Sequence, residues 1–147
     1  MNGFQYIALR CVPRVEREEF INVGVVLYCQ EEKFLRSASQ VDPARLKALD
    51  PNVDVDAVLS ALNAIEAVCR GDEHAGLGLG IRMTSTGGRE LADTLSTRFG
   101  FIKAARSTVV QPGPVHGGLT DDPETELAKL LAKLVGQTGT SSTAPTA

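Results

Sequence analysis

Short runs of apolar residues near the N-terminus predict three β-strands. Residues 4–12 have the period of two that is typical of a strand, and Pro13 ends the run because proline has no N–H to donate to a ladder. Residues 20–29 are rich in β-branched side chains. The odd-numbered residues among them are all apolar, which places them on one face, and the even-numbered ones are mixed. A strand that is apolar on nearly both faces is expected to be central in its sheet and covered on at least one side. A third run follows at residues 34–38. We expect an antiparallel meander with the second strand at its centre.

The spacing of apolar residues then changes to that of α-helices. Asp42-Pro43 is an N-cap followed by a proline in the first turn, so a short helix is expected there. A longer helix is expected from about Asp54 to Gly71, because apolar residues recur at helical spacing before that glycine. Residues 85–88 predict the start of a third helix, which ends before Gly100.

The C-terminal part predicts one more strand and one more helix. The strand is expected at residues 105–111, whereas the two prolines and three glycines of residues 111–118 predict irregular structure. Asp122-Pro123 predicts the start of a helix with one leucine-rich face, and Gly136 ends it. Residues 137–147 are rich in Ser, Thr, Ala and Gly and are expected to be disordered.

Together these elements predict a single α+β domain over residues 1–136. Its antiparallel sheet has about four strands, the N-terminal three-stranded meander plus the late strand, and three to four helices pack on one side. The length of 147 residues is that of one ordinary domain, which buries roughly 70% of the surface of its unfolded chain.

The amino-acid composition of the chain argues against several classes of function. The net charge of −3 gives no broad attraction to nucleic acid or to anionic membranes. The three cysteines lack CxxC spacing and lie in apolar runs, so we expect buried free thiols and predict no metal site and no cofactor. The first residues lack the pattern of a signal peptide, and no apolar run approaches the ~20 residues of a membrane helix. A soluble, cytoplasmic protein is expected.

A polar cluster between the first two predicted strands is the first candidate site. Its candidate binding residues are Arg10, Arg14, Glu19, Asn22 and Gly24. An arginine at a strand end can present its planar fork to a carboxylate or phosphate. An internal ion pair of Arg10 or Arg14 with Glu16 or Glu19 is the other interpretation. Gly24 predicts a bulge, or a close approach by another backbone or a ligand.

A second polar cluster lies later in the chain. It consists of Arg98, Arg106, Ser107, Thr108, Gln111 and His116. Arginines, hydroxyls and a histidine suit an anion. The other interpretation is an ordinary surface, with Arg98 exposed on a helix, Ser107 and Thr108 alternating along an edge strand and His116 on a loop. The combined hypothesis is that both clusters meet at one end of the sheet. Neither cluster contains a complete set of catalytic residues.

Two segments resemble the bacterial family of unknown function DUF3037. The first, YIALRCVPRVEREEFINVGVVLYC, has a strand ending in R-x-x-P, a charged loop and E-F-x-N-V-G-V. The matching residues are Arg10, Pro13, Arg14, Glu19, Phe20, Asn22, Val23, Gly24 and Val25. The second, RFGFIKAARSTVVQPGPVHGGLTDDPETELAKLLAKLV, has an arginine-containing strand, a Pro/Gly loop and a helix that starts with D-P. The resemblance covers roughly residues 4–135 and implies no established activity.

The resemblance implies an accessory or regulatory protein, because such proteins are associated with neighbours resembling HipA-like Ser/Thr kinases. The expected partner is such a kinase or a second copy of the chain. The alternative is a protein that binds or hydrolyses a phosphate-bearing ligand, a nucleotide or nucleic acid. That alternative requires Arg10, Arg98, Arg106 and His116 to converge on one pocket, with Glu19 as base or metal ligand.

Overall fold

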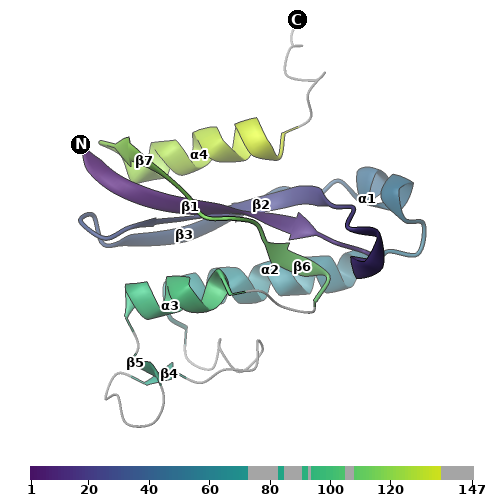
Figure 1. Cartoon of the computed structure of the whole chain (residues 1–147), viewed down its shortest axis with the longest axis horizontal. Coiled ribbons are helices and arrows are strands. Elements are labelled where there is room, and N and C mark those ends of the chain that lie inside the picture. Colours follow the sequence, from purple (N-terminus) through teal and green to yellow (C-terminus); the bar gives the residue numbers. More distant parts are fainter. Residues whose placement is uncertain (73–82, 85–90, 93, 105–107, 137–147) are drawn as a thin grey trace, which may run out of the picture.

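The computed structural model describes residues 1–72, 83–84, 91–92, 94–104 and 108–136. The predicted disordered tail at residues 137–147 and Arg106 lie outside the described residues. The described chain is an α+β protein in which an open antiparallel sheet lies between helical layers (Figure 1).

The long strand β1 lies in the middle of the sheet. On one side it pairs with β2, which pairs in turn with β3. On its other side β1 pairs with two short strands in succession, β6 along residues 9–11 and β7 along residues 2–6. The bounds are β1 Asn2–Cys11, β2 Ile21–Cys29, β3 Phe34–Ser39, β6 Val110–Pro112 and β7 His116–Thr120. The predicted meander is therefore confirmed.

The strand β7 corrects the prediction of irregular structure at residues 111–118. Gly118 of this strand serves close packing rather than a turn. A Cβ atom added at Gly118 would lie 2.8 Å from the ring of Phe4 on the neighbouring strand. Composition alone indicated a loop, because this contact depends on a strand more than a hundred residues away in sequence.

A β-bulge divides β2. Leu9 pairs with Gly24 but Arg10 pairs with Asn22, so Val23 is an extra residue on β2. Because of the bulge, Val23 packs toward α2 (Val55–Arg70), whereas Val25 packs on the opposite face. The prediction that all odd-numbered residues of this strand share a face is therefore wrong, and the prediction of a bulge near Gly24 is right.

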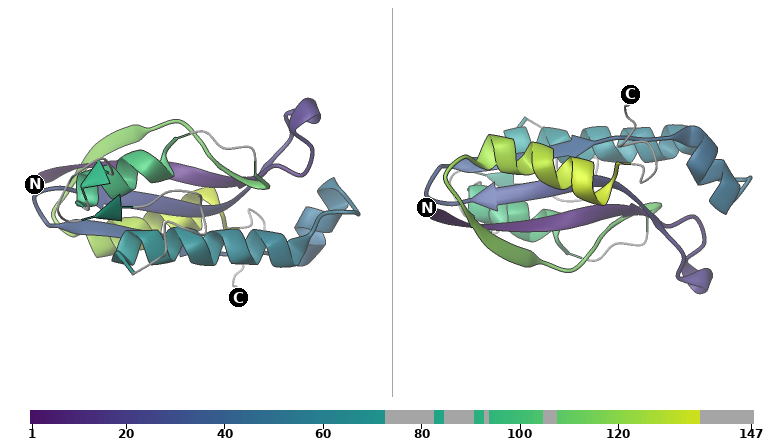
Figure 2. Two further views of the ribbon diagram at one scale, coloured as in Figure 1. Left: turned by 90° about the horizontal axis from the view of Figure 1, so that it is seen from below. Right: turned by 90° about the horizontal axis from the view of Figure 1, so that it is seen from above.

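Helices cover both faces of the sheet, which corrects the prediction that they pack on one side. The helices α2 and α3 (Leu95–Ile102) lie on one face, and α4 (Pro123–Leu134) lies on the other (Figures 1 and 2). The physical reason is that β2 is apolar on both sides. Val23 and Val26 point toward α2, whereas Leu27 and Cys29 point toward α4, and all four are at most 1% exposed.

The helices begin at side-chain caps. The carboxylates of Asp42, Asp54 and Asp122 accept backbone N–H groups at the starts of α1 (Pro43–Leu49), α2 and α4. The caps at Asp42 and Asp122 were predicted. The start predicted for the third helix, at residues 85–88, lies outside the described residues. The helix α3 begins after Thr94, whose hydroxyl accepts from the N–H of Thr97 in a capping box, and it includes Gly100, which was expected to follow its end. A threonine in place of the usual Glu or Gln hides this signal in the sequence.

The remaining described elements are small. The 3-10 turn η1 (Val15–Arg17) follows β1, and β4 (Met83–Thr84) pairs in parallel with β5 (Leu91–Ala92). All three cysteines are free and buried, as predicted, and burial raises the pKa of Cys69 to about 12. Among the helices described, none has both the length and the apolar character needed to cross a bilayer.

Candidate functional site around Arg10

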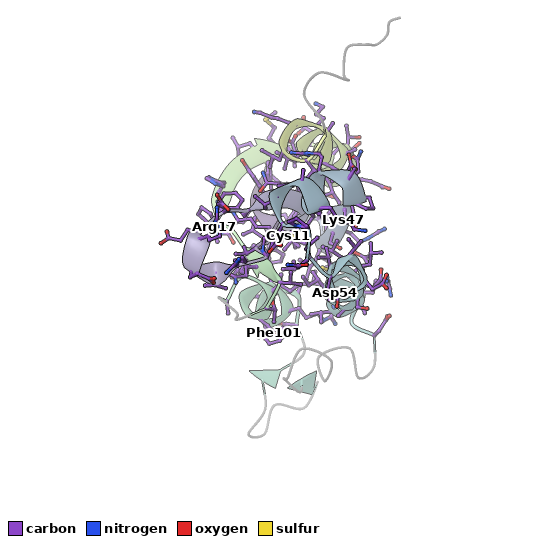
Figure 3. All side chains as sticks on the ribbon, turned by 90° about the vertical axis from the view of Figure 1, so that its right-hand side faces the viewer. Cys11, Arg17, Lys47, Asp54 and Phe101 are labelled. Atoms are coloured by element: carbon purple, nitrogen blue, oxygen red, sulfur yellow. The ribbon has the colours of Figure 1, made fainter. Side chains whose placement is uncertain are left out.

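Arg10 lies where three strands meet. It pairs with Asn22 of β2 on one side and with Gln111 of β6 on the other. Figure 3 looks at this end of the molecule, with Cys11 near the centre and the Arg17 turn and α1 on either side. Cys11 points into the α2 face, so the neighbouring Arg10 points to the face that α4 covers.

The guanidinium of Arg10 stacks on an aromatic ring. Its central carbon Cζ lies 4.0 Å from the ring centroid of Phe20, a cation–π distance. Phe20 is 43% exposed, so the pair faces solvent at least in part. The backbone of Gly113 lies close on another side, since a Cβ atom there would be 3.0 Å from Arg10 Nε. Phe20 and Gly113 thus fix the direction of this arginine.

Arg10 makes no ion pair with any carboxylate in the described part of the chain. Its Nε is buried and has no hydrogen-bond partner among the described residues. Asn22 beside it is only half satisfied. Its Nδ2 donates to the carbonyl of Leu134 at the end of α4, at 3.1 Å, whereas its buried Oδ1 has no partner in the same described set. An unused donor and an unused acceptor therefore lie on paired residues.

We call Arg10, Phe20 and Asn22 the Arg10 face. A stacked arginine keeps its in-plane N–H groups for a carboxylate or phosphate. An exposed aromatic ring adds apolar contact area. This combination is suited to binding an anionic group that is attached to a larger molecule.

The other charged residues of the first cluster pair with each other. Arg14 Nε lies 3.1 Å from Glu16, and Arg17 Nε lies 2.8 Å from Glu19. The ion-pair interpretation therefore holds for Arg14 and, through Arg17, for Glu19, but not for Arg10. These pairs are largely exposed and contribute little to stability.

The ion pairs also affect the chemistry of the glutamates. Hydrogen bonds from its own backbone N–H and from Arg14 lower the pKa of Glu16. The hydrogen bond from Arg17 lowers the pKa of Glu19. A carboxylate held in its ionised form is a weaker base, which disfavours Glu19 as a general base.

A polar groove of about 230 Å³ runs between this turn and the end of α1. Figure 2 shows η1 and α1 projecting from the same end of the sheet. The groove is lined by Pro13, Arg14, Arg17, Glu19, Leu49, Asp50 and Pro51. Its arginines already pair with glutamates, so it offers less unsatisfied charge than Arg10 does.

Among the described residues of the second predicted cluster, Gln111 lies beside Arg10, whereas Arg98 and His116 lie elsewhere; Arg106 and Ser107 lie outside the described residues. Arg98 lies on the α2 face, where Nη1 donates to the carbonyl of Cys69 at 3.5 Å and its guanidinium covers Gly71. It thus places a cation at the carboxyl end of α2. His116 stacks on Tyr6, with ring centroids 5.2 Å apart. Tyr6 is four residues from Arg10, which is about 13 Å along a strand.

The hypothesis that both clusters meet is therefore wrong for Arg98 and His116. Gln111 does lie beside Arg10, with its Nε2 donating to the carbonyl of Thr108 at 3.0 Å. No group of three or more His, Cys, Asp or Glu side chains within the described ranges is placed to hold a metal ion.

The roles of Gly24 and Phe20 in the structure differ from those that the sequence indicated. Gly24 is buried in the sheet, and a Cβ atom there would lie 2.9 Å from the carbonyl oxygen of Ala38 on β3. The close approach is thus internal and not by a ligand. Phe20 belongs to the site and was not among the candidates. A large apolar residue directly after a charged loop is the sequence signal that identifies it.

The fold and the site define a small α+β protein in which Arg10, at a strand end, stacks on the partly exposed ring of Phe20. A family model described as "Protein of unknown function (DUF3037)" matches residues 6–135. The chain belongs to the DUF3037 family. No curated protein and no solved structure matches it.

Proposed function

We propose that this chain is an accessory or regulatory protein that binds another protein through the Arg10 face. The observation that carries the proposal is the state of Arg10 itself. It is partly buried, it is stacked on the partly exposed Phe20, and no described carboxylate pairs with it. Arginine and aromatic residues are the types that most often dominate binding energy at interfaces.

The partner presents a carboxylate or phosphorylated side chain to Arg10 and apolar atoms to Phe20. Truncating an arginine that is buried in such a contact costs about 2–5 kcal/mol, which is roughly a 30-fold loss of affinity or more.

A HipA-like kinase and a second copy of this chain are the two partners to test. The first follows from the kinase neighbours that the family resemblance implies. The second follows from the exposure of Phe20, which two copies could bury against each other. The two differ in a simple observable, because self-association depends on the concentration of this chain alone.

The alternative function, binding or hydrolysis of a phosphate-bearing ligand, has less support. It requires Arg98 and His116 to join Arg10, and both lie elsewhere. It also requires a free Glu19, whose carboxylate accepts from Arg17 Nε at 2.8 Å.

The test compares wild type with Arg10→Gln in binding to a purified HipA-like kinase by calorimetry, and in self-association by analytical ultracentrifugation. The matched control is Arg14→Gln, which removes an exposed arginine that already has a glutamate partner. We expect Arg10→Gln to weaken one of the two associations at least 30-fold and Arg14→Gln to change it little.

Thermal unfolding of the same variants separates binding from folding. If Arg10→Gln unfolds the protein, the arginine serves the fold by stacking on Phe20. If it folds normally and both associations are unchanged or absent, the proposal is refuted for these partners.

A further inference from the structure

A second, chemically different cavity lies on the opposite face of the sheet from Arg10. It has a volume of about 440 Å³ and lies between α2, the end of α3 and the strand β6, which Figure 1 shows next to α2. Its floor consists of side chains of the hydrophobic core. These are Leu9, Ile65, Ile102 and Val110, each at most 8% exposed.

The cavity exists because one side of α2 carries small residues. Ala57, Ala61 and Ala64 recur at helical spacing along its wall. The neighbouring row of the same helix carries Val58 and Leu62, which fill the core. Ser60 and Thr108 of the lining are exposed, so the cavity opens to solvent and a small molecule can enter it.

The residues that line the cavity determine which kind of molecule it can hold. No charged side chain lines the cavity within the described part of the chain. The hydroxyl of Thr108 already donates to the carbonyl of Val110 at 2.6 Å, which leaves the exposed Ser60 as the other hydroxyl of the lining. Water is held poorly where it finds few polar partners, and an apolar group that displaces such water gains affinity.

We propose that this cavity binds one small, uncharged, mainly hydrocarbon molecule. Ligand sites in proteins have volumes of about 300–1,000 Å³, are mostly apolar and carry a few polar groups that orient the ligand. The alanine wall, the apolar floor and the hydroxyl of Ser60 meet each of these conditions. The site goes beyond the proposed partner binding, because it uses the other face of the sheet and excludes charge.

The test uses the uncharged fluorescent probe N-phenyl-1-naphthylamine with the full chain. We expect saturable binding with one site per chain, a blue shift of emission, and competition by 1-decanol. Ala61→Phe places a ring in the cavity and should weaken probe binding at least tenfold. The matched control is Ala128→Phe, which adds the same ring at an exposed position of α4 and should leave binding unchanged.

Ala57→Leu is the second variant, in case Ala61→Phe fails to fold. It removes less of the cavity and should weaken probe binding while the unfolding temperature stays at or above that of wild type. The proposal is overturned if wild type shows no saturable binding. It is equally overturned if a folded cavity variant binds the probe as tightly as wild type and Ala128→Phe.

Discussion

At the scale of single residues, the glycines of β7 show how closely two strands are packed. A Cβ atom at Gly118 would lie 2.8 Å from the Phe4 ring, closer than real Cβ contacts come. At Gly117 the nearest atom would be the carbonyl oxygen of Phe4 at 3.4 Å, which is an ordinary contact. Two adjacent positions of one strand thus differ in the space available for a methyl group.

We therefore expect Gly118→Ala to destabilise the protein by about 1–3 kcal/mol, because the buried Phe4 ring must shift to make room for the added methyl group. Gly117→Ala should change the free energy of unfolding by less than about 0.5 kcal/mol, as for a surface substitution. Urea unfolding of both variants checks this. Equal effects of the two substitutions would show that the Phe4 contact does not limit position 118.

Contacts of single residues also explain why the candidate site could be predicted only in part from the sequence. Arg10 and Asn22 were identified from their positions at facing ends of two strands, and they do pair. Phe20 was missed because its role depends on the stacking of Arg10, a contact that composition does not encode. Arg98 was assigned to the site, yet it caps α2, because a helix terminus distant in sequence takes its side chain.

At the scale of elements, Glu66 ties helix α2 to strand β3. Its carboxylate accepts from the backbone N–H and the hydroxyl of Ser37, at 3.0 and 2.5 Å. It also lies 3.7 Å from Arg36 and 3.4 Å from Arg70. The side chain of Glu66 is only 23% exposed, so these bonds are less screened than the pairs of the η1 turn.

Glu66→Ala should lower the free energy of unfolding by about 1–3 kcal/mol, since Ser37 loses a charged acceptor at a partly buried position. The control is Glu16→Ala, which removes an exposed carboxylate paired with Arg14 and should have little effect. Chemical denaturation of both variants measures the difference. A Glu66 variant as stable as the Glu16 variant would show that apolar packing alone holds α2 on β3.

Asp122 at the start of α4 makes stability depend on pH. Hydrogen bonds from the hydroxyl and then the backbone N–H of Thr125 lower its pKa below the ordinary value of 3.8. Because the folded-state pKa is the lower one, the stabilisation is complete above the unfolded-state pKa. It is lost as the pH falls through the folded-state pKa.

Asp122→Asn removes this titration, so its unfolding temperature should fall less steeply than that of wild type as the pH drops below about 4. Thr125→Val removes the largest cause of the shift and should flatten the same part of the curve. Thermal scans between pH 6 and pH 3 compare the three proteins. Parallel curves would contradict the role of this cap.

The elements that were predicted from the sequence form because of patterns among residues that are close together in the chain. The strands β1 to β3 and the helices α1, α2 and α4 follow from alternation, capping aspartates and glycine stops. What local patterns missed depends on distant contacts. The bulge at Val23 turns the apolar residues of β2 to both faces, and β7 forms only because β1 offers an open edge.

At the scale of the whole molecule, the two helical layers share the strands between them. Leu62 of α2 and Leu130 of α4 lie in separate hydrophobic clusters and are 5% and 6% exposed. Both clusters include residues of β1 and β2, namely Leu9 and Val26 in one and Phe4 and Leu27 in the other. Loss of either layer therefore exposes one face of strands that the other layer needs, which predicts a single cooperative unfolding transition.

Leu62→Ala and Leu130→Ala should each destabilise the protein by about 2–5 kcal/mol through a buried cavity. Each should move the whole transition, so that curves followed by circular dichroism and by tyrosine fluorescence coincide. Leu59→Ala, at a 43% exposed position of α2, is the control and should shift the midpoint far less. Separate transitions in the Leu130 variant would instead show that α4 leaves the sheet by itself. The tie between Asn22 and the end of α4 would then be released before the rest of the fold, which would also make the Arg10 face conditional on the docking of α4.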